Sequence, residues 1–151
     1  MSIAGTSIEV ILAGASSALA AQLFKMIWYL CSGKGINFRI LVQTGGMPSS
    51  HSALMVAMAV SVGLIDGFQS TIFAVATGIA VIVMYDAAGL RQAAGKMAGI
   101  LNKLTEDIYT DHPDRFPERL RELLGHTPFE VIVGAFLGAA VAAVYHVKLM
   151  G

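Results

Sequence analysis

The chain has 151 residues, of which 56% are hydrophobic and only 13% are charged, about half the charged fraction of a typical soluble domain. This composition excludes a disordered chain and favours an integral membrane protein with a single domain, residues 1–151. Ten basic and ten acidic side chains give zero net charge, so no general attraction to nucleic acid is expected.

Four apolar segments follow one another along the chain. A membrane-spanning helix needs about 20 mostly apolar residues, and the segments cover residues 7–30, 49–65, 67–85 and 128–147. The second segment is short for a span. Asp66-Gly67 is a turn signal, which predicts a helical hairpin of the second and third segments. The sequence therefore predicts an all-α bundle of about four transmembrane helices.

The stretch between the third and fourth segments is polar and carries most of the charge. We expect residues 91–104 to continue the third helix into the headgroup region, and residues 117–124 to form an amphipathic helix on the membrane surface. Gly134 and Gly138 in the fourth segment have a spacing that lets helices approach closely. We interpret these two glycines as packing residues.

Basic residues gather in two of the loops, which sets the expected orientation. The first loop carries Lys34 and Arg39, with Lys25 near its edge, and the second carries Arg91, Lys96, Lys103, Arg115, Arg119 and Arg121. The positive-inside rule places both loops in the cytoplasm and both termini outside, for which we expect a bacterial plasma membrane. Four spans then bring His51, Asp86, Arg91 and His126 to one membrane face. His146 falls near the opposite face and is interpreted as an interfacial residue.

A first histidine box, Gly45–Ser52, opens the second apolar segment. Gly45-Gly46 permits backbone angles that other residues avoid, and Pro48 suits the first turn of a helix. Ser49-Ser50 can cap that helix, whose free N–H groups favour an anion, and His51 can donate a proton. These features describe a phosphate site with an acid beside it. A glycine turn, a serine cap and a surface histidine are an equally good interpretation.

A second histidine box, Gly125–Glu130, opens the fourth apolar segment. His126 and Glu130 are four residues apart, which on a helix would place them on one face. A carboxylate there can hold one imidazole nitrogen and raise the nucleophilicity of the other. An intramembrane carboxylate without a partner is costly. One alternative is that His126 and Glu130 are a simple capping pair at a helix start. Another is a zinc site, although no two histidines of the chain have the spacing of metal ligands on a helix.

Basic side chains are expected beside both boxes: Lys25, Arg39, Arg91 and Arg121. Arginine binds phosphate oxygens in a forked geometry, and lysine binds them as a point charge. Asp86, five residues before Arg91, could orient a basic group. The alternative role for each arginine is headgroup contact or control of topology.

These segments resemble the divergent branch of the type 2 phosphatidic acid phosphatases, which is related to acid phosphatases and vanadium-dependent haloperoxidases. The resemblance lies in Thr44–Ala53, Asp86–Lys96 and Gly125–Glu130, and it spans residues 22–138. Pro48–His51 is similar to the superfamily motif Pro-Ser-Gly-His, with Ser50 in place of the glycine. His126–Glu130 is similar to the end of the motif Ser-Arg, five residues, His, three residues, Asp.

This sequence departs from the superfamily pattern in three places. Glu130 replaces the aspartate, and Arg121 has four residues rather than five between it and His126. The motif Lys, six residues, Arg-Pro is absent as such, and Lys25 and Arg39 are its counterparts at a different spacing.

The resemblance implies a metal-independent, cofactor-free hydrolase that acts on a lipid phosphate through a phosphohistidine. His126 would be the nucleophile, Glu130 would orient it, and His51 would protonate the leaving alcohol. Phosphate would be bound by Lys25, Arg39, Ser49, Ser50, Arg91 and Arg121, with Asp86, Lys96, Gly45 and Gly46 in support. Phosphatidylglycerol phosphate, phosphatidate and polyprenyl phosphates are the candidate substrates. The alternative is a non-catalytic membrane protein that binds or transports anionic lipid. A homo-oligomer is compatible with either function.

Overall fold

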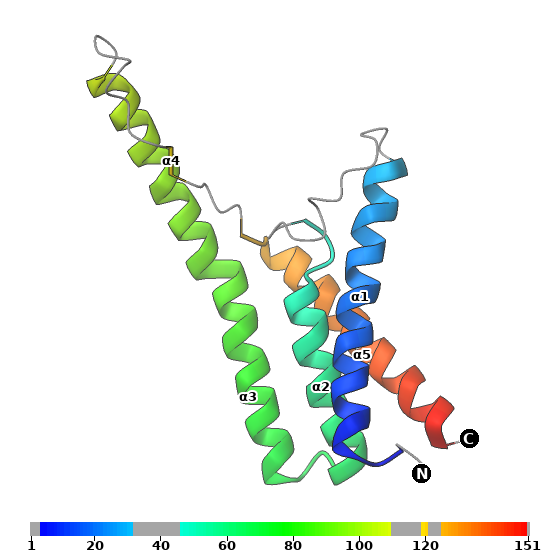
Figure 1. The fold of residues 1–151 in the computed structure, drawn as a ribbon. Coiled ribbons are helices and arrows are strands. Elements are labelled where there is room, and N and C mark those ends of the chain that lie inside the picture. Colours follow the sequence, from blue (N-terminus) through cyan, green and yellow to red (C-terminus); the bar gives the residue numbers. More distant parts are fainter. Residues whose placement is uncertain (1–3, 32–45, 110–118, 121–124, 151) are drawn as a thin grey trace.

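The computed structural model describes residues 4–31, 46–109, 119–120 and 125–150. Its described elements are helical: α1 (Ser7–Cys31), α2 (Ser50–Asp66), α3 (Thr71–Tyr85), the π-helical turn η2 (Asp86–Leu90), α4 (Arg91–Ile108) and α5 (Pro128–Met150). Figure 1 shows α1, α2, α3 and α5 side by side as a bundle, while α4 continues α3 beyond the end of the bundle. The predicted all-α architecture is confirmed.

Within the described residues, three helical stretches are long and apolar enough to cross a membrane: Ser7–Cys31, Thr71–Ile108 and Pro128–Leu149. The short apolar helix α2 has 17 residues, about 25 Å at 1.5 Å per residue. It packs against α1, α3 and α5, so protein rather than lipid covers much of its surface. The start of α1 and the end of α5 lie at the same end of the bundle (Figure 1), as four crossings require.

Small residues fill the interior of the bundle. The buried apolar positions are mostly alanine, namely Ala13, Ala21, Ala53, Ala57, Ala59, Ala80, Ala87 and Ala142. In a membrane, small side chains let helix backbones approach closely and gain dispersion and hydrogen-bond energy. Long apolar side chains such as Ile82 and Phe136 point outward instead. This distribution is expected where lipid replaces water as the solvent.

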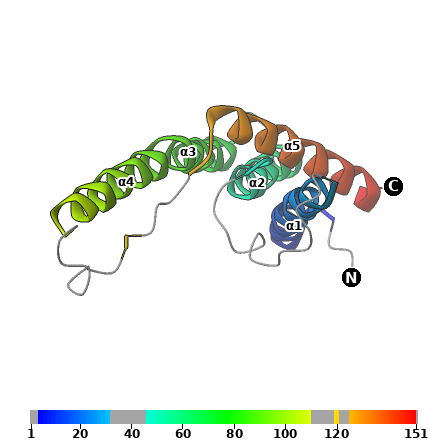
Figure 2. The ribbon, with the colours of Figure 1, turned by 90° about the horizontal axis from the view of Figure 1, so that it is seen from above.

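The closest helix approach joins α5 to α2. A Cβ atom added to Gly134 would overlap with the backbone of Ser49, and one added to Gly138 would overlap with the carbonyl group of Ala53. The interpretation of both glycines as packing residues is therefore confirmed. Figure 2, seen from above, shows α5 lying across α2 and α1.

The hairpin between α2 and α3 forms at the predicted turn. Gly67 follows the last residue of α2 with φ +90°, and its carbonyl oxygen accepts a hydrogen bond from the N–H of Ser70 (3.1 Å). The third helix was expected from residue 67 but begins at Thr71. Ser70 caps it, because its hydroxyl accepts from the N–H of Phe73 (3.2 Å).

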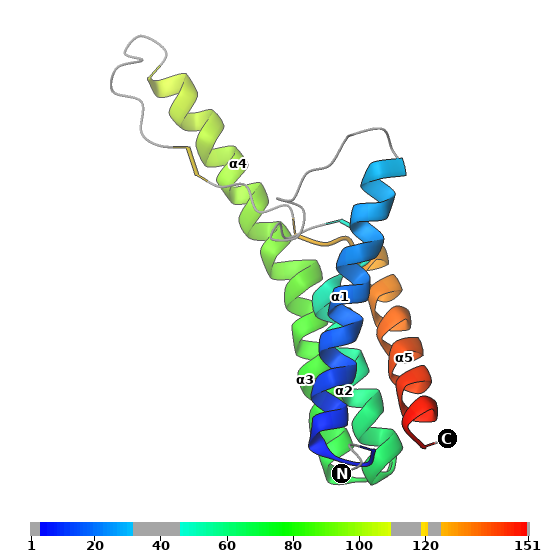
Figure 3. The ribbon, with the colours of Figure 1, turned by 45° about the vertical axis from the view of Figure 1, so that its right-hand side comes forward.

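The third span continues without a break through η2 into α4 (Figures 1 and 3). Residues 71–90 account for about 30 Å of helix, the thickness of the bilayer hydrocarbon. The predicted continuation over residues 91–104 is confirmed, and the helix extends further, to Ile108. Its 18 residues add about 27 Å, so α4 reaches well past the headgroups.

The predicted surface helix at 117–124 lies largely outside the described residues. Arg119 and Leu120 are described, and neither is helical. Both attach to α4. Arg119 pairs with Glu106 (2.9 Å), and the amide side chain of Asn102 exchanges two hydrogen bonds of 2.9 Å with the backbone of Leu120.

His146 is more than an interfacial residue. Its Nδ1 lies 2.6 Å from Oε1 of Glu9, and the other oxygen of Glu9 accepts from the N–H of Gly5 (2.7 Å). Glu9 is fully buried, and a carboxylate in a membrane helix needs such partners. The pair fastens the start of α1 to the end of α5, at the end of the bundle opposite to both histidine boxes.

Replacing Gly138 with alanine should destabilise the bundle, because the new methyl group would meet backbone atoms that cannot rotate away. We expect a cost of about 1–3 kcal/mol, the usual range for overpacking, measured as a lower melting temperature in detergent. Gly78→Ala is the matched control, since no atom lies within 4 Å of the added methyl. Equal melting temperatures for the two variants would contradict the close α2–α5 approach.

Candidate functional site

The first histidine box forms the start of α2. Gly46 has φ +80°, an angle that favours glycine. Ser49 is the N-cap, and its hydroxyl accepts from the N–H of Ser52 (3.4 Å) and from the Ser52 hydroxyl (3.0 Å). His51 lies in the first helical turn, as predicted, and is exposed. Pro48 was expected inside that turn but lies two residues before Ser50, where the helix begins.

The second histidine box is built on a reciprocal helix cap. The N–H of Thr127 donates to Oε2 of Glu130 (3.0 Å), and the N–H of Glu130 donates to the Thr127 hydroxyl (3.3 Å). This is the capping-box arrangement of a Thr-x-x-Glu sequence at a helix start. Pro128 occupies the first helical position, which suits its fixed φ.

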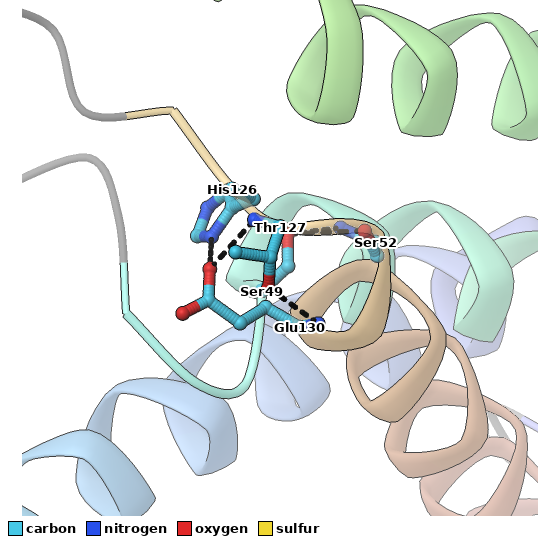
Figure 4. A network of polar contacts seen from close by, with 5 residues as sticks. All are labelled: Ser49, Ser52, His126, Thr127 and Glu130. Atoms are coloured by element: carbon cyan, nitrogen blue, oxygen red, sulfur yellow. Dashed lines mark hydrogen bonds and ion pairs between the residues drawn. The ribbon is translucent and has the colours of Figure 1, made fainter. Parts of the chain in front are cut away.

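His126 meets Glu130 through this cap and not through a shared helix face. α5 begins at Pro128, so His126 precedes the helix and the expected i, i+4 helical pairing is wrong in its geometry. The contact exists nevertheless. Nδ1 of His126 lies 3.3 Å from Oε2 of Glu130, because the cap turns that carboxylate back toward the start of the helix (Figure 4). Only 2% of the His126 side chain is exposed.

The two boxes are joined through the backbone of Glu130. Its carbonyl oxygen accepts a hydrogen bond from the N–H of Ser49 (3.1 Å). Gly134, one turn further along α5, lies against the Ser49 backbone. The start of α2 and the start of α5 are therefore held as one unit, and Figure 4 shows their polar side chains gathered there.

The π-turn η2 supplies a third attachment. In a regular α-helix the carbonyl of Ala87 would accept from the N–H of Arg91, but that N–H bonds to the carbonyl of Asp86. The Ala87 carbonyl instead accepts from the N–H of His126 (3.0 Å). Gly125, with φ +60°, packs against the backbone of Gln92. A π-turn thus positions the histidine, in keeping with the frequent placement of such turns at functional sites.

The same π-turn pairs Asp86 with Arg91. Their side chains meet at 3.0 Å between Nε and Oδ2. Residues five apart diverge on an α-helix but align where the hydrogen bonds span five residues. Asp86 thus pairs with a basic side chain, and its role in the site stays a prediction.

The first helix adds a buried cation. Lys25 is only 5% exposed and interacts electrostatically with Glu130, His51 and His126. Gln22, one turn earlier, donates from Nε2 to the Ser50 hydroxyl (3.4 Å). Arg91 and Asp86 also act electrostatically on His51, so charges from α1, η2 and α4 converge on the two boxes.

Burial is the main influence on the protonation of His126, which precedes the membrane span. It lowers the pKa of His126 below the ordinary 6.5, and repulsion from the Lys25 ammonium lowers it further. The hydrogen bond and the charge of Glu130 oppose this shift. The imidazole is therefore neutral at pH 7.

The structure brings together most of the predicted site residues that it describes: Gly46, Ser49, Ser50, His51, Lys25, Asp86, Arg91, His126 and Glu130. Lys96 is exposed on α4, more than a turn beyond Arg91. Gly45, Arg39 and Arg121 lie outside the described residues, and their roles stay predictions.

Three contributors were not identified from the sequence: Gln22, Ser52 and Thr127. Gln22 precedes Lys25 by three residues in an apolar helix, which places both on one face. Thr127 and Glu130 have the capping-box spacing. Both signals are present in the sequence. The buried hydroxyl of Ser52 has no comparable signal, since serine is common between membrane helices.

Among residues 4–31, 46–109, 119–120 and 125–150, no three side chains of His, Cys, Asp or Glu lie together as ligands would. Cys31 is the only cysteine of the chain and is exposed at the end of α1.

The protonation of His126 can be followed directly by its reaction with an acylating reagent that attacks only neutral imidazole. We expect the acylation rate to reach half of its high-pH value at a pH below 6.5, because the pKa of His126 is lowered in the folded protein. Lys25→Gln should raise that midpoint, and Glu130→Gln should lower it. The stabilisation linked to neutral His126 is present above pH 6.5 and is lost as the pH falls. A midpoint above 6.5 in the wild-type protein would contradict this account.

Comparison with known proteins places the chain in a family. A family model described as "Divergent PAP2 family" matches residues 6–141. An uncharacterized membrane protein of Bacillus subtilis (strain 168), YuiD, is 35% identical over 144 residues, which cover 89% of this chain and 91% of YuiD. No solved structure matches. The family match covers both histidine boxes, the first three apolar segments and the first part of the fourth, and the chain belongs to the Divergent PAP2 family.

Proposed function

We propose that this protein is a membrane phosphatase that hydrolyses a lipid phosphate through a phosphohistidine at His126. The observation that carries the proposal is the state of this imidazole. It is buried, held at Nδ1 by Glu130, and under the electrostatic influence of the Lys25 ammonium. A histidine whose Nδ1–H donates to a carboxylate keeps the lone pair of Nε2 available for attack.

The first chemical step is attack of Nε2 of His126 on the phosphorus atom. The bond from phosphorus to the lipid oxygen breaks, and the leaving alcohol takes its proton from His51. In the second step His51 removes a proton from water, the water oxygen attacks phosphorus, and the phosphorus–nitrogen bond breaks. Inorganic phosphate leaves, and both histidines return to their starting state.

Charge stabilisation in this reaction would come from Lys25 and Arg91, together with the predicted Arg39 and Arg121. Preorganised cations and helix N–H groups aimed at developing negative charge supply a large share of enzymatic rate enhancement. The start of α2 contributes the partial positive charge of a helix N-terminus. Asp86 holds Arg91 at Nε, so the terminal nitrogens of that guanidinium would bind the phosphate oxygens.

The substrate class follows from where the site lies. His51 lies in the first turn of α2 and His126 just before α5. Many apolar side chains on the outer surface of the bundle are exposed, so in a membrane this end of the bundle would lie near the lipid headgroups. A lipid phosphate can reach this depth without leaving the bilayer. The candidates are phosphatidylglycerol phosphate, phosphatidate and polyprenyl phosphates. The basic residues at this end favour a cytoplasmic orientation of the site in a bacterial plasma membrane.

A second candidate function has one specific observation in its favour. The N–H of Thr127 donates to the Glu130 carboxylate, so this side chain caps α5 as well as contacting His126. A non-catalytic protein that binds or transports anionic lipid would keep this cap and the cations. A vanadate-sensitive phosphatase activity in the presence of a metal chelator would favour the enzyme. Activity that disappears with the chelator would contradict the metal-independent mechanism.

The main test measures hydrolysis of a panel of lipid phosphates by the purified protein. We expect no activity from His126→Ala, and a kcat lowered about 10²–10⁴-fold in His51→Ala, the usual value of acid–base help. His112→Ala is the matched histidine control and should keep wild-type activity. Wild-type rates from His126→Ala would show that the nucleophile is assigned wrongly.

The catalytic and capping roles of Glu130 can be separated by two variants. Glu130→Gln keeps an oxygen that accepts from the Thr127 N–H but loses the charge beside His126, so kcat should fall while the melting temperature changes little. Thr127→Ala removes one half of the cap, which typically costs about 1 kcal/mol, so stability should fall more than kcat. If Glu130→Gln hydrolyses substrate at the wild-type rate, the carboxylate serves only the cap.

A further inference from the structure

Helix α4 carries an apolar stripe that the rest of the described chain does not cover. The stripe consists of Ala94, Met97, Leu101, Leu104 and Ile108. The four larger side chains are 50–73% exposed. Figure 2 shows α4 leading away from α1, α2 and α5.

The spacing of the stripe is that of a coiled coil. Successive members are three, four, three and four residues apart, which is the heptad pattern of a and d positions. Helix α4 continues α3 beyond the end of the bundle, so it would leave the bilayer instead of lying along its surface. The stripe on α4 therefore matches another helix better than it matches lipid.

The stripe continues into the membrane on α3, through Ile72, Val75, Ile79 and Ile82. These side chains are also exposed, as is Leu90. Ile82 and Leu90 are eight residues apart, which is more than two α-helical turns. Because a π-turn adds about one residue to a turn, η2 brings the two parts of the stripe back into phase.

The charges of α4 permit pairing with an identical helix. With Ala94 and Leu101 at a positions, Lys96, Lys103 and Glu106 occupy positions away from the seam. The flanking positions hold uncharged side chains, namely Ala93, Ala98, Ile100 and Thr105. Arg91 is neutralised by Asp86, and Asp107, in the last turn, is the other charged residue that flanks the seam.

The opposite side of α4 is already occupied by the chain itself. Glu106 pairs with Arg119, and Asn102 bonds to Leu120. Arg119 and Leu120 are thus attached away from the stripe. Two copies in one membrane have the same orientation, so a two-fold axis along the membrane normal would make their α4 helices parallel.

We propose that the stripe on α4 is the seam of a parallel, two-stranded coiled coil with α4 of a second copy of this chain. The pairing does not depend on the proposed phosphatase activity. It would hold two copies together at the membrane face that carries the histidine boxes.

Cysteine cross-linking in native membranes tests the seam. Cys31→Ser removes the only cysteine of the chain, and Met97→Cys, Leu101→Cys or Leu104→Cys then places one thiol on the stripe. We expect a mild oxidant to convert all three variants to covalent dimers several-fold faster than the control Lys103→Cys. That control is also exposed but points away from the seam.

The pattern of cross-links distinguishes the alternatives. Dimers at all three stripe positions require parallel helices in register. Equal rates at Lys103→Cys would indicate random collision and would overturn the proposal. An absence of dimers at every stripe position would also overturn it, because lipid or another segment of the same chain would then cover the stripe.

Discussion

The backbone contact between α2 and α5 is the constraint on which the site depends. Gly134 and Gly138 let α5 approach until its surface meets the carbonyl groups of Ser49 and Ala53. At that distance the N–H of Ser49 reaches the carbonyl of Glu130. A methyl group at either glycine would separate the helices and break the link between the two histidine boxes. The packing of small residues and the placement of polar ones are therefore one property of the fold.

Very few residues provide the hydrogen-bond partners that the polar groups of this site need near a membrane. Glu130 has three functions at once: its carboxylate caps α5, the same carboxylate holds His126, and its carbonyl anchors α2. The π-turn likewise frees the carbonyl that holds the His126 backbone and aligns Asp86 with Arg91. At the opposite end of the bundle, Glu9 and His146 fasten α1 to α5. The polar residues of the bundle therefore stabilise it at both ends.

The sequence alone predicts the helices and their order well. A run of apolar residues long enough to span a bilayer can adopt few structures other than a membrane-spanning helix. It also predicts that His51 and His126 meet at one face, since that follows from charge and the number of crossings. The geometry of the second box was predicted incorrectly. Helical spacing suggested a shared face, whereas a capping box before the helix makes the contact. The π-turn was not predicted, because a one-residue insertion has no compositional signal and shows itself only in the hydrogen bonds.

The central claim is that His126 forms a covalent bond to phosphorus. It is tested most directly by rapid acid-free quenching of the His51→Ala variant during turnover of a phosphate ester with a good leaving group, followed by mass spectrometry of the peptides. The good leaving group needs no acid, while hydrolysis of the intermediate is slowed without His51. The account predicts an acid-labile phosphoryl group on His126 that accumulates to a large fraction of the protein. Turnover with no phosphoryl group on His126, or with one on another residue, would contradict it.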